Sequence, residues 1–378
     1  MRIKYLLLYL LAIFFFTNCT QLERKQVAEN GEGFTLGSMA DEGIDSSITN
    51  KIDTAITNGT YPNIHSLLIV RNNKLVYEKY WPGKDQSWGD DLGIRTHGKD
   101  SLHDIRSISK SIVSACIGIA IQQGKIKNND EKVFAFFPEY EKLDTGLISS
   151  LTIKHLLTMS SGLAWNEDVP YDNPENSEIR MIRSANQVEY VLSQPMEFPP
   201  GQVWKYNGGT TQLLAGIIEK TTGKKIEQFA KEYLFQPLGI SSFEWIKYSG
   251  TDLAAAASGL RLRSRDLLKF GLLYYNDGRY NDTQIVSKKW IEESFQSHVQ
   301  RPGGGSYGYQ FWLWQDTIKN KPLSMVACIG NGDQRILFDK TNDLLIVATA
   351  GNYNKWNIKN SVYALAKEYV YPALINNK

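Results

Sequence analysis

Ser107 and Lys110 are the residues of this chain whose types and spacing most directly suggest chemistry. They form Ser107-Ile-Ser-Lys110 at the start of an apolar, small-residue stretch that runs to Ile121. Residues three apart share a face of a helix, so the serine hydroxyl would lie at the helix N-terminus with the lysine amine one turn along. An amine held there can accept the serine's proton. The pair therefore predicts a nucleophilic serine with its own base, although short motifs of this kind also occur on ordinary helix surfaces.

A second candidate, Tyr206, lies in the turn-rich segment 199–209, just ahead of a predicted helix. A tyrosine on such a loop can relay a proton between nucleophile, lysine and leaving group, particularly where a neighbouring ammonium lowers its pKa. The chain contains 20 tyrosines, and a loop tyrosine can equally be a packing residue at the rim of a site. Tyr206 is therefore a candidate proton relay if it lies beside Ser107 and Lys110.

Two glycines interrupt a strand-like run at Gly330-Asn331-Gly332. Glycine permits a close approach to the backbone. An N–H group near Asn331 could therefore join the Ser107 N–H in stabilising a tetrahedral oxyanion. The same three residues would also suit a hairpin turn.

The loop after Gly162 carries two aromatic residues, Trp165 and Tyr171, close to prolines. Aromatic side chains are common in the walls of ligand pockets, so both residues are candidates for lining an acyl pocket. Packing on the protein surface is the alternative for both.

The apolar pattern predicts a sheet built from both ends of the chain. Two β-branched or aromatic runs within 65–80 flank Asn72-Asn73, which is typical of a hairpin. Helical spacing dominates 105–298. Strand-like runs return over 309–314, 323–329, 335–339 and 344–350, before a helix over 359–369. Because hairpin turns connect these strands, the sheet should be antiparallel. We predict a mixed α/β fold of the α+β type, with a sheet domain (49–104 and 299–378) and an inserted helical domain (105–298).

Composition favours a globular protein that acts on a small-molecule or peptide-like substrate. The 378 residues are 42% hydrophobic, and 42 basic and 40 acidic residues leave a formal net charge of +2. Without a long basic run, no nucleic-acid partner is expected. Cys116 and Cys328 lie in predicted buried elements and should be free thiols. The sequence specifies no oligomeric state. No cofactor is expected. No metal is expected either, because the histidines lack the short separations that are typical of metal ligands; they are His65, His97, His103, His155 and His298.

The first 19 residues are typical of an export signal. Basic residues precede the apolar run 5–16, which is too short to span a bilayer. Cys19 ends a stretch that resembles a lipoprotein cleavage site, although Phe16 and Asn18 leave plain secretory cleavage as an alternative. Residues 20–48 are polar and contain glycine, as expected of a flexible tether. We expect an exported lipoprotein on the periplasmic or cell-surface side, anchored to the membrane only by a lipid on Cys19.

The Ser-x-x-Lys pair, Tyr206 and the segment 330–332, in this order and at these separations, resemble the motifs of the serine β-lactamase and penicillin-binding superfamily, in its class C-like branch. The resemblance extends over roughly residues 50–370, and its similar runs are 105–124, 151–162, 200–223, 259–273, 307–312 and 330–339. The resemblance implies a β-lactamase-like fold in which Ser107 is acylated, Lys110 is its base, and Tyr206 belongs to a Tyr-x-Asn element.

Two departures from the family pattern bear on the substrate. Gly208 stands where the family has the asparagine of Tyr-x-Asn, and Asn207, a candidate substrate contact, is displaced by one position. The third motif lacks its usual lysine or histidine. Asp333 there would repel an anionic substrate unless Arg335 turns inward. The pattern is therefore more similar to esterase and 6-aminohexanoate-dimer hydrolase relatives, which implies esters or linear amides as substrates. Penicillin hydrolysis or D-Ala-D-Ala carboxypeptidase activity is the alternative.

Two further interpretations compete with this one. Gly304-Gly-Ser306-Tyr-Gly308 matches the nucleophile elbow of α/β-hydrolases, which needs a strand before it, a helix after it and a later histidine. Pro302 and glycines precede Ser306, and no histidine follows His298. A catalytically inactive binding module of the β-lactamase-like fold is the other alternative, and the intact Ser107, Lys110 and Tyr206 argue against it.

Overall fold

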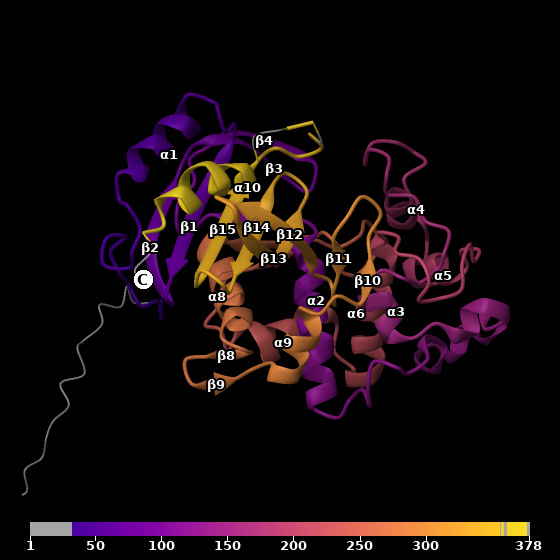
Figure 1. The fold of residues 1–378 in the computed structure, drawn as a ribbon. Helices are drawn as coiled ribbons and strands as arrows, with labels where there is room; N and C mark the ends of the chain where they lie inside the picture. Colours follow the sequence, from indigo (N-terminus) through magenta and orange to yellow (C-terminus); the bar gives the residue numbers. More distant parts are fainter. Residues whose placement is uncertain (1–31, 356, 359–360, 376–378) are drawn as a thin grey trace, which may run out of the picture.

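The computed structural model describes residues 32–355, 357–358 and 361–375 (Figure 1). The predicted signal segment and Cys19 lie outside these residues. Among the described residues, an antiparallel sheet of eight strands in the order β10-β11-β12-β13-β14-β15-β1-β2 organises the fold. Its strands are β1 (Ile64–Arg71), β2 (Lys74–Tyr80), β10 (Val299–Gln300), β11 (Ser306–Tyr307), β12 (Trp312–Ile318), β13 (Lys321–Gly330), β14 (Gln334–Asp339) and β15 (Leu344–Ala350).

The two ends of the chain meet inside this sheet, as predicted. β1 pairs with β15 from the C-terminal part, with Leu68 opposite Val347. The β1–β2 hairpin turns at Asn72 and Asn73, whose φ angles are 52° and 61°. Asparagine tolerates this left-handed conformation better than most residues, so the local sequence alone specifies the turn.

Each face of the sheet has its own hydrophobic core. Successive side chains of a strand point to opposite faces. Leu67 and Ile69 of β1 therefore join a core with α1 and α10, whereas Leu68 and Val70 join the core that contains α2 and α8. In Figure 1, α1 and α10 lie on one side of the sheet and α8 on the other. The helices are α1 (Ile48–Thr57), α2 (Ile108–Gln122), α3 (Ile153–Leu157), α4 (Ser177–Arg183), α5 (Gln187–Leu192), α6 (Gly208–Thr222), α7 (Ile226–Ala230), α8 (Ser264–Tyr275), α9 (Lys288–Ser294) and α10 (Val362–Leu365).

The described part of the predicted tether is folded onto the sheet domain. Phe34 and Ile44 are only 1% and 0% exposed. Leu36 bridges to Leu75 of β2, and Ile44 bridges to Leu374. These apolar side chains cover the edge of the sheet, so the structure replaces the expected flexible tether over residues 32–47 with ordered packing.

Helix α2 lies at the centre of the helical region, and its residues Ile108 to Ala120 are all buried. It packs against α6 and touches β13, whereas α8 packs against β1, β14 and β15. Cys116 of α2 and Cys328 of β13 are buried free thiols, as predicted. Within the described residues, no helix combines the length and apolar character that crossing a bilayer requires.

Smaller sheets complete the fold. One of them, with the order β5-β7-β6, leads directly into α2, because β5 ends three residues before Ser107. The remaining strands form two hairpins. These strands are β3 (Gly83–Ser87), β4 (Asp90–Arg95), β5 (Leu102–Asp104), β6 (Glu244–Trp245), β7 (Leu260–Arg263), β8 (Arg279–Tyr280) and β9 (Thr283–Gln284).

Candidate active site

Ser107 occupies the junction between β5 and α2, where it is the N-cap residue of the helix. The preceding residue, Arg106, has a φ of 49°, a left-handed conformation that is uncommon for a non-glycine residue and costs about 1 kcal/mol or more. The pairing of β5 with β7 holds this strained turn in place. As a result the Ser107 side chain lies at the start of a buried helix while remaining partly exposed.

Lys110 lies one turn along α2 and directs its amine at the serine. Its Nζ donates to Ser107 Oγ at 3.1 Å and to the carbonyl oxygen of Ala257 at 2.9 Å. The lysine is only 1% exposed, so the protein rather than solvent determines its surroundings. This geometry lets Lys110 exchange a proton with Ser107 directly.

Tyr206 closes the third side of this group. It lines the same cavity as Ser107, and Lys110 Nζ lies 5.0 Å from the centre of its ring. Burial in the wall of the site and the charge of Glu167 raise the pKa of Tyr206 well above its ordinary value, although the interaction with Ser107 opposes this. The condition considered in the sequence analysis, a pKa lowered by a neighbouring ammonium, is therefore not met. Tyr206 is thus a neutral phenol that can relay a proton.

Two carboxyl groups that the sequence analysis did not select lie behind Tyr206. Glu167 Oε1 accepts hydrogen bonds from Trp165 Nε1 and from the backbone N–H of Gly208, and Tyr171 donates to Oε2 at 3.1 Å. Glu178 is 2% exposed and accepts a hydrogen bond from Ser258 Oγ at 2.8 Å. Burial and the nearby Glu178 charge raise the pKa of Glu167 to about 8, against the opposing effect of Lys110.

These carboxyl groups explain the departure at Gly208. A β-carbon on Gly208 would lie 3.0 Å from Glu167 Oε1 and 3.2 Å from the carboxyl carbon of Glu178. An asparagine side chain at this position would collide with both groups. The side chain of Glu167 therefore fills the space that the asparagine of the family's Tyr-x-Asn element would take. The glycine at position 208 was the one signal in the sequence that another polar group lies there.

The residues predicted around the nucleophile divide into two groups. Gly330, Asn331 and Gly332 face a cavity beside Ser107. The Asn331 side chain donates to Asn354 Oδ1 at 2.7 Å and accepts from the Asn354 N–H at 2.9 Å, which fixes this turn. Asn207, by contrast, is 1% exposed and caps α6 by accepting a hydrogen bond from Thr210 N–H. Its amide oxygen therefore serves the helix rather than the cavity.

The two aromatic candidates of the 163–171 loop also have different positions. Tyr171 lines the cavities on both sides of Ser107. Trp165 is 2% exposed and lies behind Glu167, where its indole N–H donates to the carboxyl group at 2.6 Å. Trp165 thus orients Glu167. It does not line either cavity, contrary to the prediction.

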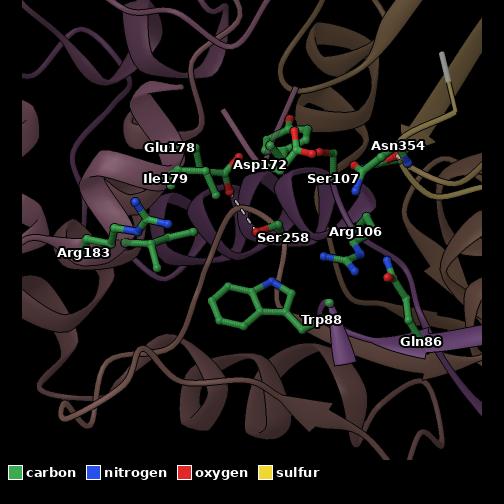
Figure 2. A pocket seen from close by; sticks show the side chains of 14 residues that line it. Gln86, Trp88, Arg106, Ser107, Asp172, Glu178, Ile179, Arg183, Ser258 and Asn354 are labelled. Atoms are coloured by element: carbon green, nitrogen blue, oxygen red, sulfur yellow. Dashed lines mark hydrogen bonds between the residues drawn. The ribbon is translucent and has the colours of Figure 1, made fainter. Parts of the chain in front are cut away.

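Ser107 lies between two cavities of about 330 Å³ each, which share Ser107, Tyr171 and Asn331. The first cavity is largely apolar, and its lining also includes side chains of both charges. Figure 2 shows Ser107, Arg106 and Trp88 around it, with the Glu178–Ser258 hydrogen bond among its lining residues. The second is aromatic and polar; its lining includes Glu167, Trp204, Tyr206, Trp312, Asp333, Arg335 and Lys355. A substrate bound at Ser107 can therefore extend in two directions.

The two charged residues of the third motif, Asp333 and Arg335, form an ion pair. Arg335 Nη2 forms an ion pair with Asp333 Oδ1 at 2.8 Å, and both residues line the second cavity. Arg335 also donates to the carbonyl oxygens of Gly330 and Gln334. Arg335 thus reaches this cavity, but Asp333 neutralises much of its attraction for an anionic substrate.

Ser306, the candidate of the competing α/β-hydrolase hypothesis, lies in a different setting. It belongs to the two-residue strand β11, which pairs with β10 and β12. A nucleophile elbow requires a sharp turn from a strand into a helix, and β11 is followed by β12. The structure excludes this alternative.

Comparison with known proteins agrees with the geometry. The family model described as Beta-lactamase matches residues 63–359. The chain belongs to the beta-lactamase family. An uncharacterized protein of Alkalihalophilus pseudofirmus is 23% identical over 239 residues, which are 58% of this chain and 61% of that protein, so the chain spans less than two thirds of this relative's length.

Two other relatives and one solved structure are also similar to this chain. The 6-aminohexanoate-dimer hydrolase of Paenarthrobacter ureafaciens is 24% identical over 306 residues, covering 75% of this chain and 71% of the relative. Esterase EstB of Burkholderia gladioli is 25% identical over 181 residues, or 46% and 44% of the two chains. The structure of a putative 6-aminohexanoate-dimer hydrolase from Bacillus anthracis superposes with a TM-score of 0.68 at 20% identity, covering 92% and 87% of the chains. This last likeness confirms the predicted fold.

Proposed function

We propose that this protein is a serine hydrolase that acts through an acyl-enzyme on esters or linear amides. The observation that carries the proposal is the Lys110–Ser107 hydrogen bond, with Tyr206 beside it, on the wall between two cavities. A nucleophile with its base at hydrogen-bond distance and a proton relay beside them is what acyl transfer requires. The two cavities give separate room to the acyl group and the leaving group.

The first half of the reaction forms the acyl-enzyme. Lys110 takes the Ser107 proton while Oγ bonds to the substrate carbonyl carbon, whose oxygen becomes an oxyanion. Backbone N–H groups at Ser107 and near Asn331 stabilise that charge. When the tetrahedral intermediate collapses, the bond to the leaving group breaks and Tyr206 passes the proton from Lys110 to the departing oxygen or nitrogen.

In the second half, water hydrolyses the ester on Ser107. The water gives up a proton to the Lys110–Tyr206 pair as its oxygen bonds to the acyl carbon. Ser107 Oγ then leaves and recovers its proton, which restores the starting state.

Two features favour esters and linear amides over β-lactams. Gly208 offers no side-chain amide to hold an amide group of the substrate, and Glu167 occupies that space. Arg335 of the third motif is already paired with Asp333, so this side chain offers a carboxylate such as that of a penicillin little net attraction.

A substrate panel tests the proposal. Wild-type protein and Ser107→Ala are assayed with p-nitrophenyl esters of increasing acyl length, a linear 6-aminohexanoyl amide and nitrocefin. We expect kcat/KM for the best ester to exceed that for nitrocefin by about 100-fold or more, which corresponds to about 2.7 kcal/mol, and no turnover by Ser107→Ala. Faster hydrolysis of nitrocefin than of any ester would overturn the substrate assignment. Absence of turnover with the whole panel would favour a binding module.

We also propose that the protein is exported and held at the membrane by a lipid on Cys19. The basic start, the short apolar run and Cys19 at its end support this proposal. Expression of the full chain and of Cys19→Ser, followed by membrane fractionation and labelling with a fatty-acid analogue, tests it. Lipid label and membrane association should both disappear in Cys19→Ser. Equal membrane association of the two proteins, without label in either, would contradict the anchor.

A further inference from the structure

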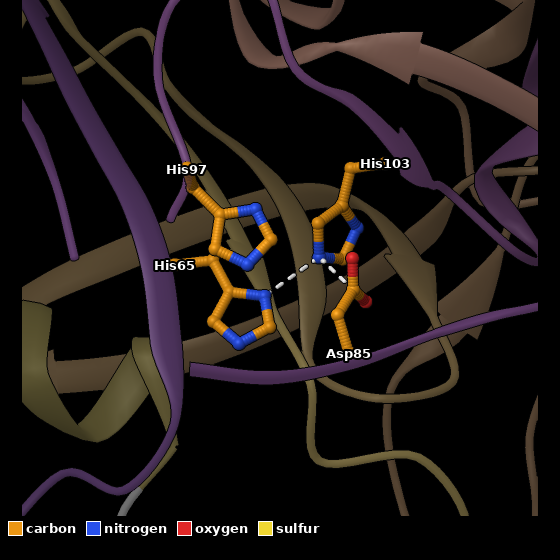
Figure 3. A group of neighbouring side chains, drawn as sticks. All are labelled: His65, Asp85, His97 and His103. Carbon is orange, nitrogen blue, oxygen red and sulfur yellow. Dashed lines mark hydrogen bonds and ion pairs between the residues drawn. The ribbon is translucent and has the colours of Figure 1, made fainter. Parts of the chain in front are cut away.

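A second polar cluster lies apart from the Ser107–Lys110–Tyr206 group. It consists of His65 on β1, Asp85 on β3, His97 between β4 and β5, and His103 on β5, and one ligand atom from each lies within 4.8 Å of all the others (Figure 3). His65, His103 and Asp85 are 0%, 1% and 4% exposed. These residues show no metal-binding spacing in the sequence because they come from three separate strands and a loop, and the fold brings them together.

The hydrogen bonds around His65 determine which of its nitrogens carries a proton. Asn63 donates its Nδ2 to the carbonyl oxygen of Lys84 and accepts the Lys84 N–H on its Oδ1, which fixes the orientation of the amide. That same Oδ1 lies 3.2 Å from His65 Nε2. Since an amide oxygen can only accept, Nε2 must donate. In a neutral ring, Nδ1 of His65 therefore holds a lone pair directed into the cluster.

The same argument applies to His103. Its Nδ1 lies 3.0 Å from the carbonyl oxygen of Asp104, which also can only accept. Nε2 of His103 is therefore the unprotonated nitrogen, and it lies 2.8 Å from Nδ1 of His65. Two lone pairs at this separation repel each other unless a cation lies between them. The outer hydrogen bonds thus orient both rings as those of metal-bound histidines are oriented.

Asp85 and His97 bring two more electron-pair donors to the same point. Asp85 Oδ1 lies 3.5 Å from His103 Nε2 and also accepts hydrogen bonds from the Gln86 N–H and from Tyr353 OH. His97 stacks on His65, with ring centres 4.0 Å apart. Its Nε2 is buried and has no hydrogen-bond partner among the described residues. A buried polar atom without a partner is costly, and a bound cation would satisfy it.

We propose that His65, His97, His103 and Asp85 bind a zinc ion. Three imidazoles and one carboxylate are a donor set that suits Zn²⁺ rather than Mg²⁺ or Ca²⁺, and four protein ligands make the site structural rather than catalytic. Tetrahedral zinc with bonds of about 2.0 Å places its ligand atoms about 3.3 Å apart. The His65–His103 contact would therefore lengthen slightly, and His97, on a loop, would move inward.

The position of the site gives the ion a role. His103 lies on β5, which leads through Arg106 into Ser107. A zinc ion would fasten β5 to β1 and β3, so that the strained turn before the nucleophile is held by a metal as well as by the β5–β7 pairing. The site is thus expected to support the position of Ser107 without touching the substrate.

Metal analysis of the full chain, purified without a polyhistidine tag, tests the proposal. The protein is stripped with a chelator, reloaded with Zn²⁺ and freed of excess metal before metal analysis and thermal unfolding. We expect about one zinc per chain and a rise in Tm of about 5 °C or more. His97→Ala and Asp85→Asn should lose both effects. His155→Gln is the matched control, because glutamine suits the N3 position of the α3 capping box that His155 occupies, and it should keep both.

Three results would contradict the proposed zinc site. Less than about a tenth of an equivalent of zinc on the wild type, with no change in Tm, would mean that the cluster holds an extra proton instead of a metal. Equal zinc content in His97→Ala, Asp85→Asn and wild type would place the ion elsewhere. Co²⁺ provides a readout that needs no variant: strong visible absorption bands of tetrahedral cobalt on the wild type support the site, and the weak spectrum of octahedral cobalt contradicts it.

Discussion

At the scale of single residues, the site depends on charged and polar groups that the protein, rather than solvent, surrounds. Lys110 is 1% exposed, and its amine contacts Ser107 Oγ and the Ala257 carbonyl oxygen. Tyr206 and Glu167 lie beside it, and the pKa of each is raised above its ordinary value. Neutral Tyr206 is suited to passing a proton, so the role of base falls to Lys110.

Replacing Lys110 with methionine keeps the volume of the side chain but removes the base. We expect kcat/KM for esters to fall by about 10²–10⁴-fold, the usual contribution of a general base, while far-UV circular dichroism stays the same. Lys269→Met is the control, because Lys269 is a buried lysine of α8 that bonds to Gly239 and pairs with Asp266. It should lower Tm and leave activity intact. Near wild-type activity of Lys110→Met would remove Lys110 from the mechanism.

The raised pKa of Glu167 makes the free energy of unfolding depend on pH. The ordinary pKa of a glutamate is 4.5, and in the folded protein that of Glu167 is about 8. Between these values the unfolded chain has released the proton that the folded protein retains. The free energy of unfolding therefore falls as pH rises, by at most about 1.4 kcal/mol per pH unit. The stabilising contribution is complete below pH 4.5 and is lost as pH rises through about 8.

Glu167→Gln should remove this dependence. Urea unfolding at pH 5, 7 and 9 should show the variant similar to wild type at pH 5 and progressively more stable than wild type at pH 7 and 9. Glu141→Gln, at an exposed glutamate, should match wild type throughout. A difference between Glu167→Gln and wild type that is constant across this range would show that the carboxyl group does not titrate there.

Gly208→Asn restores the family's asparagine but should not create a β-lactamase. A β-carbon at this position already meets Glu167 Oε1 at 3.0 Å, so the larger side chain must displace Glu167 or Glu178. We expect a loss of stability of about 1–3 kcal/mol from overpacking and lower ester turnover, measured by urea unfolding and by a p-nitrophenyl ester assay. Gly208→Asn with wild-type stability and a gain of nitrocefin turnover would contradict this account of the departure.

At the scale of elements, local signals in the sequence were sufficient where one turn or one helix face decides the structure. Asn72-Asn73 predicted the β1–β2 hairpin, and the i, i+3 spacing of Ser107 and Lys110 predicted their contact on α2. Glu167 and Glu178 could not be predicted in the same way, because a loop brings Glu167 to the site and α4 brings Glu178. The histidine cluster was missed for the same reason: its members lie on β1, on β5 and between β4 and β5, and only tertiary pairing joins them.

Helix α2 offers a test in which helix propensity and packing oppose each other. A β-carbon on Gly118 would lie 2.5 Å from the indole ring of Trp290, which is 6% exposed on α9. Alanine gains about 1 kcal/mol of helix propensity over glycine, whereas overpacking costs about 1–3 kcal/mol.

Packing should therefore dominate, and Gly118→Ala should unfold at a lower urea concentration than wild type. Gly98→Ala, where a β-carbon meets nothing within 4 Å, should be neutral or slightly stabilising. A more stable Gly118→Ala would mean that Trp290 moves aside at little cost.

At the scale of the whole molecule, the pairing of β1 with β15 joins segments from both ends of the chain in one sheet, and both segments contribute to the cores on its two faces. The described residues before α1 are part of this structure, since Phe34 and Ile44 are buried. The nucleophile helix α2 reaches from this sheet domain into the helical region, and Ser107 lies at its start. The fold therefore places Ser107 and Lys110 at the start of a buried helix, with the two cavities beside them.

The central claim is that Ser107 alone becomes acylated, and intact-protein mass spectrometry with peptide mapping tests it most directly. Wild type, Ser107→Ala and Ser306→Ala are each treated with a fluorophosphonate and, separately, with a slowly hydrolysed ester. We predict a single adduct on the peptide that contains Ser107 in wild type and in Ser306→Ala, and no adduct in Ser107→Ala. An adduct that persists in Ser107→Ala, or that maps to another serine, would contradict the account.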